Sequence, residues 1–315
     1  ANTRVEVQGI VDAYNAILGE ANGASADANV IDPTAEQYAA IGVTGVTTGV
    51  KTDLLGDVIG SKVTTDVDTV AEVQALADAV AAVMANATGA STVSVAQLQA
   101  LGITGVTTDN MAAVQAAIAA TTDSGTGVDS QSELQTLVNT VNNAVGVIST
   151  YAQANTQSAP TAPTGTAPTA TDYANAGVTG FVSANLSAIN DALASANVTG
   201  LSVDTPAEIQ TLVNAYNAVI AHAISGAAPA PTAAQYAAIG VTGVNASTEV
   251  SLLADVIDAK AAADVSTVAQ VQALADAVQA VMNTAAGLTP AATVDQLTLL
   301  GVTGVTSGNL SRVLT

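Results

Sequence analysis

The chain has 315 residues, with 26 Asp and Glu against 5 Lys and Arg, which gives a formal charge of −21. That balance excludes the basic surface that nucleic-acid binding needs. Cys and Trp are absent, only one His is present and aromatics are 2% of residues, so disulfides and thiolate chemistry are excluded and a core must be built from aliphatic side chains.

Residues 1–32 predict a single helix. Thr3 and Glu6 have the spacing of a capping box, in which each side chain bonds the other residue's backbone N–H. The apolar residues that follow lie on one face of a helix: Val7, Ile10, Val11, Tyr14 and Ile17. No second helix within this segment covers that face, so we assign it as half of a structural unit.

Residues 33–91 predict a complete unit of three helices, named A, B and C. Helix A opens with a capping box at Thr34 and Gln37 and ends at Gly42, where a left-handed cap is expected. Helix B is expected from about Lys51 to Ser61. Helix C is about 18 residues long, opens with a capping box at Thr69, and carries an apolar stripe of helical period.

The same three segments recur in residues 92–155, 169–230 and 231–290. A Gly-Val-Thr-Gly block, with Ile for Val once, follows each helix A and begins at Gly42, Gly102, Gly177, Gly240 and Gly301. A Gln recurs in each helix C, at Gln8, Gln74, Gln135, Gln210 and Gln272. The Pro33–Gly42 segment returns 198 residues later at Pro231–Gly240, which indicates a duplicated block of three units. Such repetition is typical of arrays and scaffolds.

Residues 156–168 interrupt the array with a stretch rich in Pro and Thr. Proline at this density prevents a helix, so we expect an exposed linker or loop. The alternative is a modified segment, with O-glycans on the Thr residues of 156–169.

Residues 291–315 predict a helix A and part of a helix B without a helix C. Their apolar residues are Leu297, Leu300, Leu310, Val313 and Leu314. Head-to-tail docking of two copies would complete a unit and would propagate, because the two surfaces differ. Alternatively, the chain is a window cut from a longer array, or the first helix stacks on an intact neighbouring unit.

Residues with possible chemistry are few. His222 lies at the end of a helix C, where other copies have Glu20, Asn86 and Thr284, and we interpret it as an imidazole favoured by the helix dipole. Asp66 and Asp68 are candidates for a weak surface calcium site, although the loop lacks the Gly and late Glu of an EF-hand. A solvated acidic turn is the alternative. We predict no catalytic residue, no cofactor-binding residue, no other metal ligand and no enzymatic activity.

No uninterrupted run of 18 apolar residues is present, so no membrane span is expected. The recurrent tyrosines are expected in the core or at interfaces. The pattern Ala-Ala-Ile-Gly-Val-Thr-Gly-Val, followed by Thr-Val-Ala-Glu-Val-Gln-Ala-Leu, resembles the tandem Ala/Thr/Val-rich helical repeats of large bacterial cell-surface proteins of the biofilm-associated, adhesin-like or surface-layer-like kind. That resemblance covers essentially the whole chain and implies a secreted, surface-exposed structural role.

Together these features predict an all-α fold of about four three-helix-bundle units, solenoid-like, with incomplete units at both ends. The predicted function is an extracellular structural protein that assembles with copies of itself into a filament, sheath or surface layer. A passive stalk or spacer of a giant adhesin, whose binding domain lies outside this chain, is the alternative.

Overall fold

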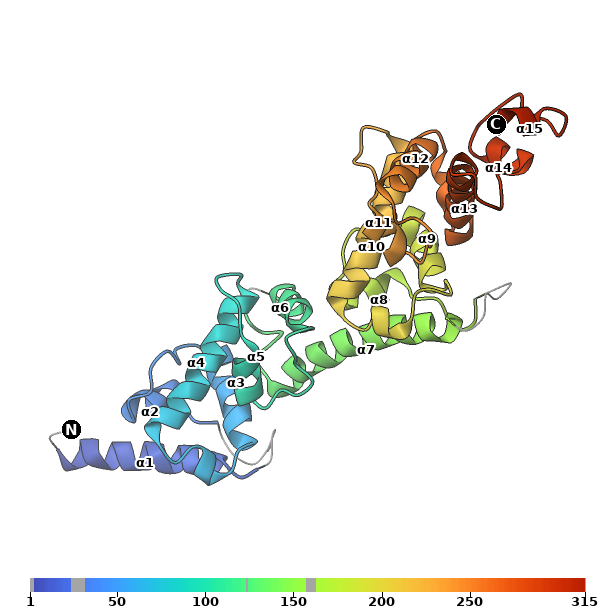
Figure 1. The fold of residues 1–315 in the computed structure, drawn as a ribbon. Coiled ribbons are helices and arrows are strands. Elements are labelled where there is room, and N and C mark those ends of the chain that lie inside the picture. The colour runs from blue at the N-terminus through green and yellow to red at the C-terminus, as the bar shows by residue number, and fades with distance from the viewer. Residues whose placement is uncertain (1–2, 24–31, 123, 157–162, 315) are drawn as a thin grey trace. The chain divides into compact units, whose positions relative to one another are not determined.

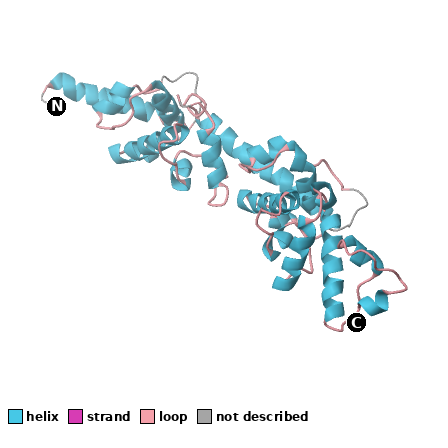
Figure 2. Ribbon diagram, turned by 90° about the horizontal axis from the view of Figure 1, so that it is seen from above, coloured by secondary structure: helices cyan, strands magenta, loops and turns pink. Residues whose placement is uncertain are grey.

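The computed structural model describes residues 3–23, 32–122, 124–156 and 163–314. The described residues form helices joined by loops (Figures 1 and 2). Fifteen α-helices and three short 3₁₀ helices occur in these ranges, and the only extended pairing among them is an isolated bridge between Asn22 and Val63. The all-α class is therefore confirmed. The chain divides into two compact lobes, residues 1–143 and 144–315, and the boundary lies inside a helix instead of in the Pro/Thr-rich segment.

Five long helices correspond to helix C: α1 (Arg4–Glu20), α4 (Val70–Ala87), α7 (Gln131–Asn155), α10 (Pro206–Ile224) and α13 (Val268–Ala285). Four of them begin with both bonds of the predicted capping box. In α7 the Glu133 side chain accepts from Asp129 N instead, at 3.1 Å. This helix has 25 residues, more than predicted, because its apolar period continues through buried Ile148 and Tyr151.

Five short helices correspond to helix A: α2 (Ala35–Ala40), α5 (Val95–Ala100), α8 (Ala170–Asn175), α11 (Ala233–Ala238) and α14 (Val294–Leu299). All five carry the predicted capping box. The first Gly of each Gly-x-Thr-Gly block has a positive φ, for example 92° at Gly42, and ends the helix as predicted.

Helix B corresponds to α3 (Gly49–Gly60), α6 (Met111–Ala119), α9 (Ser183–Leu193), α12 (Ser247–Asp258) and the one-turn α15 (Leu310–Val313). Three 3₁₀ turns, η1 (Thr64–Asp66), η2 (Gly200–Ser202) and η3 (Ala262–Val265), lead from helix B into the following helix C. The described part of the Pro/Thr-rich segment, Thr156 and residues 163–168, is not helical, and residues 157–162 lie outside the described residues.

In the N-terminal lobe, α4 packs against α3 before it and against α5 and α6 after it. One aliphatic core joins these helices, with Leu54, Val80 and Leu98 fully buried. A helix C therefore contributes to the repeat that follows it as well as to its own. Among the described helices, α4 alone is long and apolar enough to cross a membrane, and half of it is buried inside the lobe, as in a core helix.

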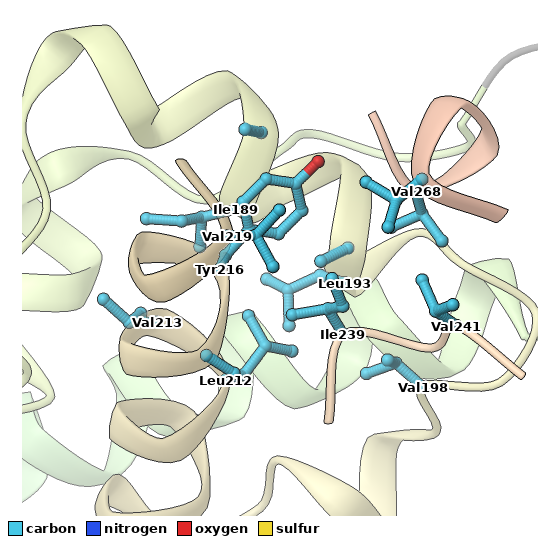
Figure 3. Close-up of a cluster of buried hydrophobic side chains, with 14 of the residues drawn as sticks. Ile189, Leu193, Val198, Leu212, Val213, Tyr216, Val219, Ile239, Val241 and Val268 are labelled. Carbon is cyan, nitrogen blue, oxygen red and sulfur yellow. The ribbon is translucent and has the colours of Figure 1, made fainter. Parts of the chain in front are cut away.

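The C-terminal lobe repeats this packing, because α10 contacts α9, α11 and α12. Figure 3 shows side chains of α9 and α10, Ile189, Leu193 and Tyr216 among them, in one cluster with Ile239, which follows α11, and with Val241 of the Gly-Val-Thr-Gly block. Tyr38, Tyr173, Tyr216 and Tyr236 are all fully buried, as the repeated tyrosines predicted. Burial raises the pKa of each of these hydroxyls, which keeps them neutral.

Candidate docking surfaces

The first half of α1 exposes an apolar face. Val7 is 51% exposed and Val11 is 46% exposed, whereas Val73 and Ala77, which hold the same positions in α4, are 0% and 2% exposed. Ile10 is also exposed, and its counterparts Leu76, Leu212 and Leu274 are buried. The helix type is the same in each case, so the difference lies in what packs against it: α3 covers this face of α4, and α12 covers that of α13.

The second half of α1 is already packed. Ile17 is fully buried against the core of its own lobe, and the Tyr14 hydroxyl donates to the backbone carbonyl of Asp68. The face that we predicted as one interface of five residues is therefore reduced to Val7, Ile10 and Val11, with Tyr14 at its edge. The reason is that α1 also packs against α2 and α3, the helices that follow it.

At the other end, α14 and α15 leave a second apolar surface uncovered. Val302 is 42% and Val313 is 48% exposed, whereas the equivalent Ile103 and Val114 are 2% and 0% exposed. Leu297 is not part of this surface, because it is buried in a small cluster with Ala280 and Ala292. Leu300, Leu310 and Leu314 are partly buried against their own lobe.

A hydrogen-bonded contact between helix C and the Gly-x-Thr-Gly block recurs four times. In the first copy, Thr44 N donates to Gln74 Oε1 at 2.8 Å, and Gln74 Nε2 donates back to Thr44 O at 3.3 Å. Gln74 Nε2 also donates to Asp78, one helical turn further on. We call this two-way amide contact the Thr–Gln clamp. The other three clamps join Thr104 to Gln135, Thr179 to Gln210 and Thr242 to Gln272.

Two half-clamps remain, one at each docking surface. Gln8 of α1 is exposed and bonds Asp12 at 2.8 Å, as the internal Gln residues bond theirs. Within the described residues, no Thr backbone meets Gln8, and no Gln meets the backbone of Thr303. The Thr and the Gln of the clamp both recur in the sequence, but only the structure, in which helix C lies beside the loop that precedes helix B, shows that they bond each other.

A buried polar side chain at the end of helix C is a second recurrent device. Both ring nitrogens of His222 lie near carbonyl oxygens, Nδ1 at 3.0 Å from Ala228 O and Nε2 at 3.1 Å from Ala254 O. The equivalent Asn86 donates to Gln115 O and accepts from Val93 N. Glu20 at this position in α1 is buried too. The predicted position of His222 in the last helical turn is correct, and its contacts tie helix C to the following helix B.

The calcium candidates Asp66 and Asp68 lie on the surface around η1, and Asp66 caps that turn by accepting from Val63 N. Among the described residues, no group of three or more His, Cys, Asp or Glu side chains is arranged to hold a metal ion. Asp32, Asp57 and Asp129 of the N-terminal lobe lie close to other acids. Burial first, and then neighbouring carboxylates, raise the pKa of each of these three groups.

Two shallow open grooves accompany these elements. One of about 400 Å³ is lined by polar side chains of α7, including Gln131 and Asn139, together with Asp57 of α3. The other, of about 170 Å³, lies beside Asn197 and Glu208 in the C-terminal lobe. Their lining groups already bond within the chain, as Gln131 does with Leu101 O at 2.8 Å. The two uncovered helical surfaces are therefore the candidate docking sites. No protein-family model, curated protein or solved structure matches this chain.

Proposed function

We propose that this chain is an extracellular structural protein whose copies join head to tail, with α1 of one copy packing on α14 and α15 of the next. The single observation behind the proposal is the contrast between α1 and α4. The same helical positions are buried by a preceding helix B in α4 and exposed in α1, while α14 and α15 expose the positions that a helix C covers in the internal repeats.

The apolar character of both surfaces supports association. Docking would remove three apolar side chains of α1 from water, Val7, Ile10 and Val11, together with Val302 and Val313 of the other copy. Burial of apolar area is the main driving force for such contacts. The two surfaces are unlike each other. A contact between unlike surfaces leaves one of each free after every addition, so it continues into a filament, a sheath or a layer.

The finer architecture belongs to the same proposal. Each helix A, helix B and helix C would form one layer of a continuous array, and the half-units at the two ends would close into a further layer when two copies meet. The proposal assigns no enzymatic role, no nucleic-acid partner and no cofactor, because the features that repeat in this chain are caps, apolar stripes and amide contacts. The acidic charge, with few Lys residues, suits the outside of a cell.

A passive spacer within a longer surface protein is the second candidate. The observation that favours it is the equivalence of the uncovered surfaces to internal ones, since further repeats of the same chain would cover them equally well. The two candidates differ in one measurable respect, which is whether the isolated 315-residue chain associates with itself.

Sedimentation velocity over a wide range of protein concentration, followed by negative-stain electron microscopy with and without calcium, separates them. Concentration-dependent growth into polymers with a regular axial repeat supports head-to-tail assembly. Single particles at every concentration contradict it and favour the spacer. Val7→Asp is the interface variant and Val147→Asp, an exposed Val on α7, is the matched control. Protease treatment of intact cells that carry the protein tests the extracellular location.

A further inference from the structure

We infer that two amide contacts, Gln8 with Thr303 and Asn15 with Asn309, set the register in which a second copy of this chain docks. The inference rests on the proposed function and identifies the residues that make its contact specific. Apolar faces of Ala, Val, Leu and Ile can slide past one another at little cost, whereas paired amides satisfy each other in one geometry only.

The first contact follows from the Thr–Gln clamps. All four internal clamps join the Thr of a Gly-x-Thr-Gly block to the Gln of the next helix C, with Thr N to Gln Oε1 distances of 2.8 to 2.9 Å. In each, the residue four positions after the Gln accepts from its amide nitrogen, and Asp12 already does so for Gln8. Gln8 and Thr303 are thus the two halves of a fifth clamp.

The second contact follows from two Asn pairs inside the chain. Asn110 Nδ2 donates to Asn142 Oδ1 at 2.7 Å and to Gly105 O at 2.8 Å, and Asn142 Nδ2 donates to the same carbonyl. Asn185 and Asn217 repeat the arrangement on Gly180 O, with the two amides 2.6 Å apart. We call each such set an Asn–Asn–Gly triad.

The chain ends carry the two halves of a third triad. Asn309 Nδ2 donates to Gly304 O at 2.9 Å, and Asn309 Oδ1 accepts from Thr306 N at 2.7 Å, so its amide is already oriented as in Asn110. Asn15 is exposed on α1, and its spacing from Gln8 is the spacing of Asn142 from Gln135 and of Asn217 from Gln210. Thr303 and Asn309 likewise keep the spacing of Thr104 and Asn110.

The residues at this contact differ in the other two repeats. At the equivalent contact, the first repeat has Lys51, which donates to Gly45 O at 2.9 Å, opposite Ala81. The fourth repeat has Glu249 opposite Gln279, whose side-chain amide lies 2.8 Å from the Glu249 carboxylate and donates to it when the amide oxygen and nitrogen are interchanged. Asn309 is of the same type as Asn110 and Asn185, and Asn15 is of the same type as their partners Asn142 and Asn217.

Two contacts seven residues apart on one helix specify a register, because a shift of one residue turns a helix by about 100° and moves both amides off their partners. Docking by these contacts would seat Val7 and Val11 over α14 and α15, where Val302 and Val313 are uncovered. The polar contacts and the apolar faces thus require the same placement of the second copy.

Cross-linking tests the register directly, because the chain has no Cys of its own. Two variants, Asn15→Cys and Asn309→Cys, each keep the Gln8 and Thr303 half-clamps. Mixed at a concentration where the wild type is polymeric and treated with a short bis-maleimide, they should give covalent dimers joined between positions 15 and 309, identified by mass spectrometry. Neither variant alone should give them. Asn143→Cys, at an exposed Asn of α7, replaces Asn15→Cys in the control mixture and should not cross-link.

Association of Asn15→Asp and Gln8→Glu, measured by sedimentation, completes the test. Each places a carboxylate opposite a backbone carbonyl and should weaken association about tenfold or more, while Asn143→Asp leaves it unchanged. One outcome would contradict the register alone: the wild type and both acidic variants polymerise equally well, and no 15–309 product forms. The register inference is then wrong, and head-to-tail assembly stands. If the wild type remains monomeric throughout, the proposed function itself fails.

Discussion

Helices α1 and α4 belong to one lobe and share a capping box, a period and a Gln at the same place, and yet they differ in their environment. In α4 a preceding helix B packs against the apolar face, and in α1 that face is open over the first two turns of the helix. The comparison shows that the apolar stripe of a repeat is not evidence of burial. The apolar stripe shows which face of the helix can pack against another element. Whether that face is buried depends on the neighbouring repeat.

The largest effect expected from this comparison is in α4. Val73→Asp places a carboxylate in a fully buried site and should destabilise the N-terminal lobe by about 4 kcal/mol or more, which is enough to unfold it. Val7→Asp changes the equivalent residue of α1, where the side chain is half exposed, and should leave the free energy of unfolding within about 0.5 kcal/mol of wild type. Urea unfolding followed by circular dichroism measures both. Equal destabilisation by the two variants would contradict the exposed placement of α1.

The same contrast applies to the last helices. Leu297→Asp should release α14 from its own lobe, because Leu297 is buried beside Ala280 and Ala292, at a cost of about 3 kcal/mol. Val313→Asp should keep α14 in place and prevent association only. Amide hydrogen exchange over residues 290–314 reports the first effect and sedimentation velocity the second. Slow exchange in Leu297→Asp would show that this end of the chain is held by other contacts.

A smaller effect is expected at the polar position that closes helix C. The His222 ring lies between the carbonyl oxygens of Ala228 and Ala254, and His222→Leu removes the hydrogen bond that a ring N–H donates there, which should cost about 2 kcal/mol. Asn86→Leu should cost a similar amount in the other lobe, because it removes the contacts to Gln115 and Val93. Chemical unfolding with one probe in each lobe tests both. Destabilisation by only one of the variants would show that the two positions are not equivalent.

The smallest effect concerns pH and is expected mainly in the N-terminal lobe, where burial raises the pKa of three acids, although burial also raises the pKa of Asp191 in the C-terminal lobe. Burial and neighbouring carboxylates raise the pKa of Asp57 in the folded N-terminal lobe, and the same holds for Asp32 and Asp129. An acid whose folded pKa is raised contributes stability below its unfolded pKa, near 4, and loses that contribution as the pH rises through the folded value. The melting temperature of this lobe should therefore rise by a few degrees when the pH is lowered from 7 to 4.5.

Asp57→Asn is the control for that shift. It removes the charge while keeping an acceptor for Gln131 N, so the variant should melt higher than wild type at pH 7 and show a smaller change with pH. Differential scanning calorimetry at several pH values measures both quantities. A wild-type lobe that melts lower at pH 4.5 than at pH 7 would mean that another group controls its acid response.

Local features of this protein could be read directly from its sequence. The helix starts at Thr3, Thr34 and Thr69 are capping boxes in the structure, and Gly42 ends helix A with a positive φ. These features depend on hydrogen bonds between residues three or four positions apart, and the backbone conformation of glycine is a property of a single residue. The all-α class follows from their repetition.

Contacts between distant residues could not be read in the same way. The sequence placed Ile17 and Leu297 on free surfaces, and packing against α2, α3 and α13 buries them. The Gln of helix C and the Thr of the Gly-x-Thr-Gly block recur in the sequence, but the sequence does not show that they bond each other, as Gln74 and Thr44 do across 30 residues. Hydrogen bonding within a helix is local and is encoded locally, whereas burial depends on which other segment removes a side chain from water, and only the tertiary structure decides that.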